Sequence, residues 1–394
     1  MAKFRAKQLL RLCESHGASA VMKHLKAATD EKKVSLSDYS IKDLAHTFLG
    51  ESWGAKFRHL SSDDGFRIEE AAGQPVKSTL FSNITGQLLF SEIRKQFDSE
   101  AFVFSGLVPT VATAIDGTET VPSIGNMGDV SESVGEGQEY PSVGVTEGYW
   151  TIPLKTKRGM KIEVTEESIF FDRTNLLVEA AANVGQSLAI RKEKDIIDVF
   201  SGQTNNYSRN GTATNTYLLS GAYVNNQSGT DLVDWSDIDS AELLFADILD
   251  PTTSEPLADL PASERQLVVM PHRVHTAKRI LGATEVRDTA GSNFETLSAN
   301  TVAPYTLVSS RLLYRQVLSV LETVAATAQA IWWLGSIQRA FAWYENWPLA
   351  VFRQGGESNA GFERDISMRF KARYRGVAVV REPRWITRNE NAAV

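Results

Sequence analysis

The residues best placed to bind a metal ion are His272 and His275. In the helix predicted to begin at Pro271 they are three positions apart, so they share one helix face, as two metal ligands would. No cysteine or carboxylate with ligand spacing accompanies them. The sequence therefore predicts no metal site, and it predicts no other cofactor.

Residue pairs that could support hydrolysis or acyl transfer are also incomplete. Glu166 and Glu167 are adjacent, and adjacent side chains point apart, which suits neither geometry of a two-carboxylate glycosidase. Cys13 precedes His16 in a basic amphipathic segment, and the sequence contains no Gly-x-Ser-x-Gly motif and no phosphate-binding glycine loop. The chain is predicted not to be an enzyme, with no catalytic residue and no small-molecule substrate.

An aromatic concentration lies between residues 332 and 352. Such rings could stack on sugars or bases, or they could form core and subunit interface, and the apolar residues interleaved with them favour the second interpretation. A carbohydrate-binding protein or enzyme would also need two convergent carboxylates, and Glu345 is the only candidate near these rings in the sequence. The rings belong to Trp332, Trp333, Phe341, Trp343, Tyr344, Trp347 and Phe352.

Charged residues are segregated along the chain. Residues 110 to 154 contain no lysine or arginine and are rich in acidic residues, glycine and serine, so much of this segment cannot build a core of its own. The segment is therefore either flexible or ordered by a partner. The hypothesis that the partner is an adjacent subunit predicts that its carboxylates dock on basic residues there, in ion pairs that set register. The candidate contact residues are Asp116, Glu119, Asp129, Glu132, Glu136, Glu139, Glu147, Lys155, Lys157, Arg158, Lys161, Arg369, Lys371, Arg373 and Arg375.

Composition limits the compartment and the class of partner. A single cysteine excludes an intrachain disulfide framework, and no signal-peptide pattern opens the sequence, which predicts a reducing compartment such as the cytoplasm. No apolar run reaches the roughly 18 residues that a membrane helix needs, so a soluble protein is expected. A formal net charge of -7 and a pI near 5.6 argue against a dedicated nucleic-acid binder.

The first half of the chain is predicted to mix helices with one long hairpin. Residues 1 to 80 have the pattern of a basic helical segment. Leu107 to Ile115 and Trp150 to Val164 are the predicted legs of the hairpin. A helix follows from 175 to 200, and the charged run from Arg191 to Asp195 suggests that it emerges at the edge of a sheet.

The second half is predicted to be an α+β unit followed by two strands. Ser236 is the expected cap of a helix, Gln266 to Met270 is a buried strand, and Pro271 starts a helix that ends at Gly282. Near the C-terminus, the cations from Arg369 to Arg375 alternate with apolar residues along one strand. A second, buried strand is expected from Val377 to Val380, after Gly376.

This order of elements resembles the major capsid protein of tailed bacteriophages, the Hong Kong 97-type shell fold that is shared with encapsulins. The resemblance covers roughly residues 81 to 394. Its most specific stretch runs from Thr156 to Thr174, the strand and turn that enter the long helix. Ser82 to Gln87 and Arg373 to Val380 also carry it.

The resemblance implies a division into named parts. Residues 1–80 would be a helical segment that is either scaffold-like and cleaved or retained. The remaining parts would be an N-arm at 81–110, an extended loop at 111–162, a peripheral domain at 163–235 and 351–394 with its spine helix at 175–200, and an axial domain at 236–350.

The resemblance also implies a function. The chain would assemble into hexamers and pentamers of an icosahedral phage head enclosing double-stranded DNA, in virions assembled in the bacterial host cytoplasm. Expected partners are other copies of the chain, packaged DNA through weak contacts, and a portal, scaffold, maturation protease or decoration protein, with no membrane. The alternatives are an encapsulin-like compartment and the carbohydrate-binding protein or enzyme considered above.

Overall fold

The computed structural model describes most of the chain after residue 88. The described ranges are 89–124, 133–134, 136–140, 147–165, 176–221, 223–250, 255–256, 260–288, 296–300, 305–321, 325–355 and 366–391. The predictions for residues 1–80 and for the first part of the N-arm lie outside these ranges. The chain divides into two compact units. Unit 1 takes the described parts of Met1–Ser99, Lys157–Ile190 and Trp347–Tyr374, and unit 2 takes those of Glu100–Thr156, Arg191–Asn346 and Arg375–Val394.

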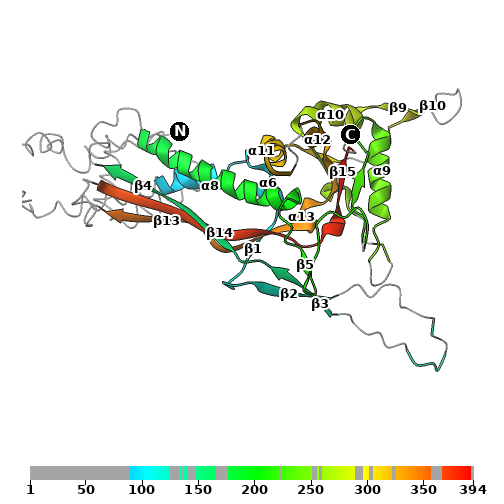
Figure 1. Cartoon of the computed structure of the whole chain (residues 1–394), viewed down its shortest axis with the longest axis horizontal. Coiled ribbons are helices and arrows are strands. Elements are labelled where there is room, and N and C mark those ends of the chain that lie inside the picture. The colour runs from blue at the N-terminus through cyan, green and yellow to red at the C-terminus, as the bar shows by residue number, and fades with distance from the viewer. Residues whose placement is uncertain are drawn as a thin grey trace, which may run out of the picture. The chain divides into compact units, whose positions relative to one another are not determined.

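Three long elements contribute residues to both units (Figure 1). They are the helix α8 (Leu176–Phe200) and the strands β13 (Phe341–Gly355) and β14 (Ile366–Val380). The two strands belong to a four-stranded sheet of order β1-β13-β14-β4, in which β1 is Thr110–Ala112 and β4 is Thr156–Thr165. Helices and mixed sheets in one chain confirm the predicted α+β class.

The strand β14 carries the predicted row of cations. Phe370, Ala372 and Tyr374 are buried, whereas the basic residues between them are exposed or half-buried, so the predicted alternation is confirmed. The prediction of a separate strand after Gly376 is wrong, because β14 continues to Val380. A Cβ at Gly376 would lie 2.5 Å from Cζ2 of Trp343, so the indole ring occupies the space that any side chain would need.

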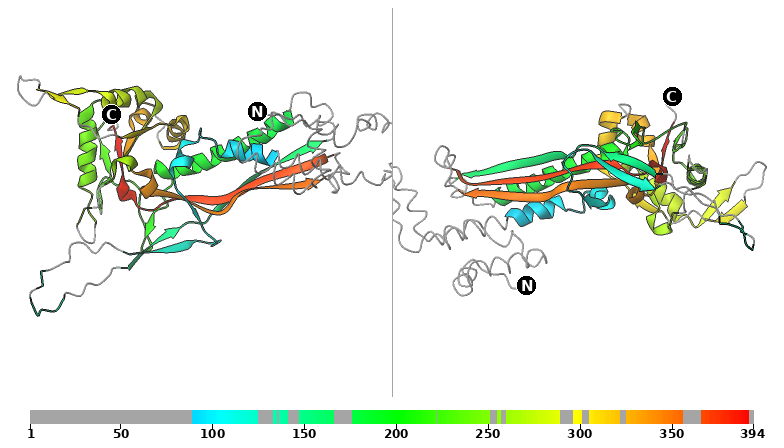
Figure 2. Two further views of the ribbon diagram at one scale, coloured as in Figure 1. Left: turned by 180° about the vertical axis from the view of Figure 1, so that it is seen from behind. Right: turned by 90° about the horizontal axis from the view of Figure 1, so that it is seen from below.

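Within unit 1, helices cover one face of these strands. Figures 1 and 2 show the first part of α8 running along β4, β13 and β14. Residues 89–97 are also helical, and Phe97 packs against Tyr374 with ring centroids 5.6 Å apart. The two helices approach closely at Gly185, where a Cβ would lie 2.4 Å from the Ile93 carbonyl oxygen. Because Tyr374 faces these helices, the alternating basic residues of β14 point to the opposite face of the sheet.

The long helix α8 confirms the predicted helix at 175–200 from residue 176 onward. Its charged run does not emerge at a sheet edge as predicted, because Glu193 is fully buried. The Glu193 carboxylate accepts hydrogen bonds from the backbone N–H groups of Phe104 at 2.8 Å and Ser105 at 2.7 Å. These groups belong to the first turn of α6 (Val103–Leu107), so the buried charge caps a second helix.

A five-stranded sheet forms the core of unit 2. Its order is β11 (Thr306–Val308), β8 (Gln266–Val269), β12 (Trp332–Gly335), β15 (Ile386–Glu390) and β7 (Asn226–Ser228). The helices α9 (Trp235–Ala246) and α10 (Val274–Gly282) contribute apolar side chains to the same core cluster as β8 and β12. The strand predicted from Gln266 is confirmed, as is the helix after Pro271, which begins with a 3-10 turn, η3 (Pro271–Arg273).

The helix α9 begins earlier than predicted. Its N-cap is Asp234 and not Ser236, because the side chains of Asp234 and Asp237 form a reciprocal capping box with the backbone. The five-stranded sheet also takes β7 and β15 from segments that the sequence assigned to the peripheral domain. The domain limits at 235 and 351 therefore do not coincide with the limits of this sheet, and the peripheral and axial labels remain predictions.

The long hairpin is formed by other legs than those predicted. The strand β2 (Glu119–Ile124) pairs antiparallel with β3 (Glu147–Ile152), whereas β1, within the predicted outgoing leg, pairs parallel with β13. The predicted returning leg is split between β3 and β4, which belong to different sheets. The sheet of the hairpin is completed by β5 (Ser208–Arg209) and β6 (Thr212–Ala213).

The remaining elements are short. They are η2 (Ala262–Glu264), β9 (Glu285–Asp288), β10 (Thr296–Ala299), α11 (Arg311–Gln316), the π-helical turn η4 (Val317–Leu321), α12 (Ala325–Ala330), α13 (Ile337–Ala340) and η5 (Pro383–Trp385). The strands β9 and β10 form an antiparallel hairpin within unit 2.

Candidate assembly interface

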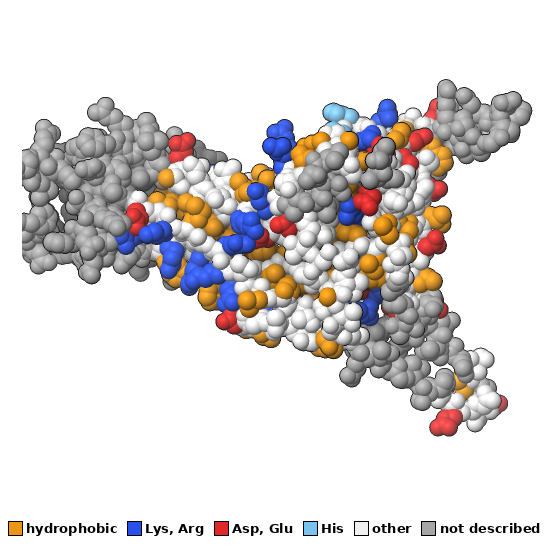
Figure 3. Space-filling view, in the orientation of Figure 1, with side chains coloured by type: hydrophobic (Ala, Val, Ile, Leu, Met, Phe, Trp, Pro, Cys, Tyr) orange, Lys and Arg blue, Asp and Glu red, His pale blue; other side chains and the backbone are white. Residues whose placement is uncertain are grey.

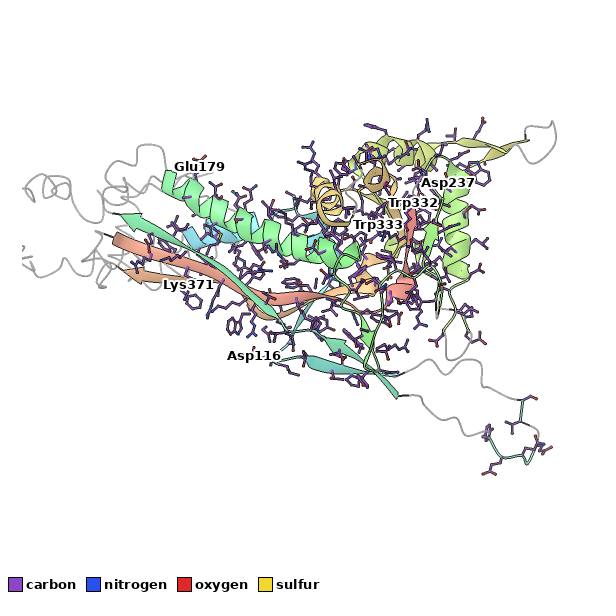
Figure 4. The ribbon with its side chains drawn as sticks, in the orientation of Figure 1. Asp116, Glu179, Asp237, Trp332, Trp333 and Lys371 are labelled. Atoms are coloured by element: carbon purple, nitrogen blue, oxygen red, sulfur yellow. The ribbon has the colours of Figure 1, made fainter. Side chains whose placement is uncertain are left out.

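A basic and aromatic surface covers the helix-free face of the sheet in unit 1. We call it the basic–aromatic surface and define it by Lys157, Lys371, Arg373, Trp347 and Phe352. Arg373 lies over both rings, with its guanidinium carbon 4.7 Å from the Trp347 centroid and 4.5 Å from the Phe352 centroid. The Lys157 ammonium lies 5.7 Å from the Trp347 centroid, and that of Lys371 lies 5.3 Å from the Phe352 centroid. Lys371 is labelled in Figure 4, and Figure 3 shows the row of basic side chains along this edge.

This surface is open to solvent and carries excess positive charge. The rings of Trp347 and Phe352 are 38% and 44% exposed. Cation–π contacts orient the three cations but do not neutralise them. Within the described part of the chain, no carboxylate pairs with Lys157, Lys371 or Arg373. The surface can therefore accept carboxylates from another molecule, with exposed rings beside them to cover apolar groups.

Other predicted cations are paired within the chain. The Glu163 carboxylate forms ion pairs with the Lys161 ammonium at 3.0 Å and with the Arg369 guanidinium at 3.4 Å. Arg158 also interacts within the chain. These three residues lie in unit 1 with the basic–aromatic surface, but part of their charge is already balanced.

A buried ion pair fixes the base of the hairpin in unit 2. The Lys155 side chain is fully buried, and its ammonium donates to the carbonyl oxygens of Ile115 and Gly117 at 3.2 Å each and to the Glu119 carboxylate at 3.0 Å. Thr113 donates a further hydrogen bond of 2.7 Å to Glu119. Burial raises the pKa of the Glu119 carboxyl, but the hydrogen bonds from Thr113 and Lys155 and the ammonium charge outweigh it and hold the pKa below its ordinary value.

A second ion pair ties the same hairpin base to β14. Arg375 forms an ion pair with the Asp116 carboxylate and donates a hydrogen bond of 3.2 Å to the Lys155 carbonyl oxygen. Lys155, Glu119, Asp116 and Arg375 thus form what we call the hairpin lock. Their partners lie within the same unit, so we do not carry these four residues into the assembly proposal below.

The acidic segment is described only in part. Glu136 and Glu139 are exposed, and Tyr140 beside them is 81% exposed. Asp129 and Glu132 lie outside the described residues, and Glu147 is the first residue of β3. The Glu136 and Glu139 carboxylates are therefore available to a partner.

A family match decides what kind of protein carries these surfaces. Residues 148–389, more than half of the chain, match the family described as phage capsid protein. The chain belongs to the phage capsid protein family. This membership confirms the predicted capsid function, and it means that the chain is a virion protein that acts through association with other capsid subunits.

Solved capsid structures resemble the chain at low sequence identity. The capsid of the cyanophage P-SCSP1u is 13% identical, with a TM-score of 0.48 and coverage of 74% of this chain and 88% of that one. The capsid of a native GTA particle is 13% identical, with a TM-score of 0.45 and coverage of 74% of this chain and 91% of that one. The mature capsid of bacteriophage PhiM1 is 13% identical, with a TM-score of 0.44 and coverage of 74% of this chain and 87% of that one. No curated protein matches the sequence. The family assignment rests on the family match.

The residues considered for chemistry do not form a site in the described part of this capsid protein. His272 and His275 are exposed on η3 and α10, and the described residues contain no cluster of three or more potential metal ligands. Cys13, Glu166 and Glu167 lie outside the described residues. None of the described helices is both long and apolar enough to cross a membrane.

The aromatic concentration separates into two groups that sequence reasoning did not distinguish. The rings of Trp332, Trp333 and Trp343 are buried, so they cannot stack on a sugar. Trp347 and Phe352 are exposed and share Arg373. Their odd spacing would place them on opposite faces of a regular strand, so β13 departs from strict alternation between them. Pro348 follows Trp347 directly and is the one signal in the sequence for this departure.

Proposed function

We propose that this phage capsid protein is the major capsid protein of a tailed phage with a Hong Kong 97-type shell. In this proposal it assembles in the host cytoplasm into hexamers and pentamers of an icosahedral head around double-stranded DNA. The net charge of -7 supports weak contacts with the packaged DNA. A portal, scaffold, maturation protease or decoration protein would complete the particle.

The subunits would be joined by the acidic segment of one copy lying on the basic–aromatic surface of the next. One observation carries this proposal: two exposed lysines and the half-buried Arg373 lie over two exposed rings without a carboxylate from the described chain. The acidic segment supplies the matching groups, since Glu136, Glu139 and Tyr140 are exposed. An arm that docks on a neighbour makes a heterologous contact, which closes into a ring when the rotation between copies closes.

Each contact of this kind is weak, and the shell gains from repetition. An exposed ion pair contributes about 0 to 1 kcal/mol, and an exposed cation–π contact contributes about 0.5 to 1 kcal/mol. Two or three such contacts per copy change the stability of one interface modestly, but they recur at every interface of a shell. Charge complementarity also fixes the register in which copies meet.

A charge exchange tests the proposal. Lys371→Glu with Arg373→Glu should leave a folded, soluble subunit and abolish regular shells, and Glu136→Lys with Glu139→Lys should do the same. All four substitutions together should restore shells, because the ion pairs are re-formed with reversed polarity. Negative-stain electron microscopy and sedimentation give the readout. Shells that persist in both double variants would overturn the docking proposal.

A deletion tests the segment as a whole. Replacing residues 125–146 with a short glycine turn keeps β2 and β3 joined, so the subunit should retain its fold by circular dichroism. Stable shells should then be absent. Normal particles from this variant would show that the segment is not needed for assembly.

A further inference from the structure

The helix α9 has an outer face that no described element covers. Ile238 and Ala241 point into the core, whereas Asp239, Leu243 and Asp247 are exposed at helical spacing. Leu243 is 64% exposed, and Val233 and Leu249 are exposed near the two ends of the helix. Figure 3 shows hydrophobic and acidic side chains alternating along the edge formed by α9, whose N-terminal Asp237 is labelled in Figure 4. We call Asp239, Leu243 and Asp247 the acidic–apolar face.

The negative charge on this face is not balanced within the described part of unit 2. Asp247 is the C-cap of α9, where the helix dipole already places partial negative charge, and the last turn of α9 contains no basic residue. Neither Asp239 nor Asp247 has a cationic partner among the described residues. The face therefore combines an exposed leucine with carboxylates in a place where the helix dipole favours a cation.

A complementary face lies on α10 and α11 of the same unit. Lys278 and Arg279 are exposed on α10, next to the buried Ala277 and Ile280. Arg311 and Arg315 are exposed on α11, on either side of the buried Leu313. The view in Figure 3 shows Lys, Arg and His side chains along the upper edge, over α10 and α11. We call Lys278, Arg279, Arg311 and Arg315 the α10–α11 basic face.

The cations of this face have no carboxylate partner in the described chain, whereas two nearby arginines do. Arg273, just before α10, is paired with Asp231, and Arg339 is paired with Glu264. By contrast, the described chain offers no carboxylate to any residue of the α10–α11 basic face. Unit 2 thus carries one unpaired acidic face and one unpaired basic face, on different helices and along different edges (Figures 1 and 3).

We propose that the acidic–apolar face of α9 in one copy binds the α10–α11 basic face of the next copy. Because the two faces lie on different edges, the contact is head-to-tail, and repetition of it forms a ring when the rotation between copies closes. The aliphatic stems of the lysine and arginine side chains would cover Leu243 while their charged groups meet Asp239 and Asp247. The inference rests on the proposed function, and it names a contact that is separate from the basic–aromatic surface.

Double-stranded DNA is the other polyanion that the basic face could meet. DNA would pair with the cations, but it would leave Leu243 exposed and Asp247 without a cation. A second copy of the chain satisfies both faces with one contact, so we argue for the second copy and treat DNA binding as an outcome of the test.

Mixing of two variants gives the sharpest test. In variant one, Asp239→Lys and Asp247→Lys reverse the acidic–apolar face, and Asp247→Lys also suits the helix dipole, so the fold should persist. In variant two, Lys278→Glu, Arg279→Glu, Arg311→Glu and Arg315→Glu reverse the charge of the basic face. Each variant alone should form rings at least tenfold less well than the unaltered chain, by sedimentation and native mass spectrometry. An equimolar mixture should form rings again, with the two variants alternating.

Alternation makes the expected result specific. A ring of alternating variants can close only with an even number of subunits, so hexamers should return and pentamers should not. Rings of unchanged yield in either variant, or a mixture that stays monomeric although the unaltered chain forms rings, would overturn this inference and leave the proposed function standing. If variant two forms normal rings and only loses retention of DNA, the basic face serves nucleic acid and the inference is also wrong. If the unaltered chain and the mixture both remain monomeric, the proposed function fails together with it.

Discussion

Removal of the Lys155 ammonium should detach the base of the hairpin from its anchor. Lys155→Met keeps a long apolar side chain in the buried site but deletes the donor to Gly117, to Ile115 and to the Glu119 carboxylate. The Ile115 carbonyl oxygen retains one donor, since Asn346 reaches it at 2.8 Å. The Gly117 carbonyl oxygen loses the lysine donor, and the hydrogen bond from Thr113 is what the carboxylate keeps from the described residues.

The expected cost follows from the charge left behind. Breaking a buried ion pair by removing one partner typically costs about 3 to 5 kcal/mol, because the remaining charge is uncompensated. The Glu119 side chain is 16% exposed, so water relieves part of this penalty and the lower end of the range applies. We expect about 3 kcal/mol for Lys155→Met, which corresponds to roughly a hundredfold change in a local opening equilibrium.

Hydrogen exchange measures this effect where it occurs. Amides of β2 and β3 should exchange roughly a hundredfold faster in Lys155→Met, whereas amides of β8 and β12 should be unchanged. The matched control is Lys157→Met, because Lys157 is two residues away but exposed, and its loss should cost less than about 1 kcal/mol. Adding Glu119→Gln to Lys155→Met should recover about 1 kcal/mol or more, since the unpaired charge is then gone.

Equal exchange rates in Lys155→Met and Lys157→Met would refute this reasoning. That result would mean that the buried ammonium contributes no more than an exposed one. A double variant that is no more stable than Lys155→Met would refute the assignment of the cost to an unpaired carboxylate, even if the hairpin loosens.

Two further predictions concern acid stability and close packing. Glu119 has a folded pKa below its ordinary value of 4.5, so its contribution to stability is present above that value and is lost as pH falls through the folded pKa. Urea unfolding at several pH values should show an acid loss that is weaker in Glu119→Gln. Gly376→Ala should destabilise the folded protein by about 1 to 3 kcal/mol, because the new methyl group would clash with the indole ring of Trp343. Gly106→Ala should stabilise the folded protein by about 0.5 to 1 kcal/mol, because Gly106 lies in a helix with open space around it. Thermal unfolding of both variants checks the opposite signs.

Elements defined by local periodicity could be predicted from the sequence. The helix α8 and the alternation along β14 follow from patterns within one segment, and the bounds of α8 agree with the prediction over the described range, whereas β14 is longer than the predicted strand. The resemblance to phage capsid proteins also rests on Thr156 to Thr174, a stretch that lies entirely inside the matched family region. Local order and family membership were therefore accessible without a structure.

Features that depend on distant partners could not be predicted. Lys155 was expected at a subunit surface because it begins a basic stretch, but its partners are carbonyl oxygens about 40 residues earlier. Glu193 was expected where the helix emerges at a sheet edge because it lies in a charged run, but a backbone turn about 90 residues earlier requires an acceptor there. A sequence pattern records that a residue is charged, and it does not record which backbone groups need that charge.

The position of β15 in the five-stranded sheet limits when this sheet can fold during translation. The strand β7 pairs with β15, which follows it by about 160 residues, and β15 also forms the second neighbour of β12. At a synthesis rate of about 5 to 20 residues per second, β7 waits roughly 8 to 30 s for its partner. The strand β12 is complete about 50 residues before β15 begins, so its edge stays open to other strands for roughly 3 to 10 s, and a chaperone or an aggregating chain would bind there. Subunits can present a finished α9 side of the sheet only after β15 has left the ribosome, so recruitment to a growing particle is delayed until translation of this region is complete.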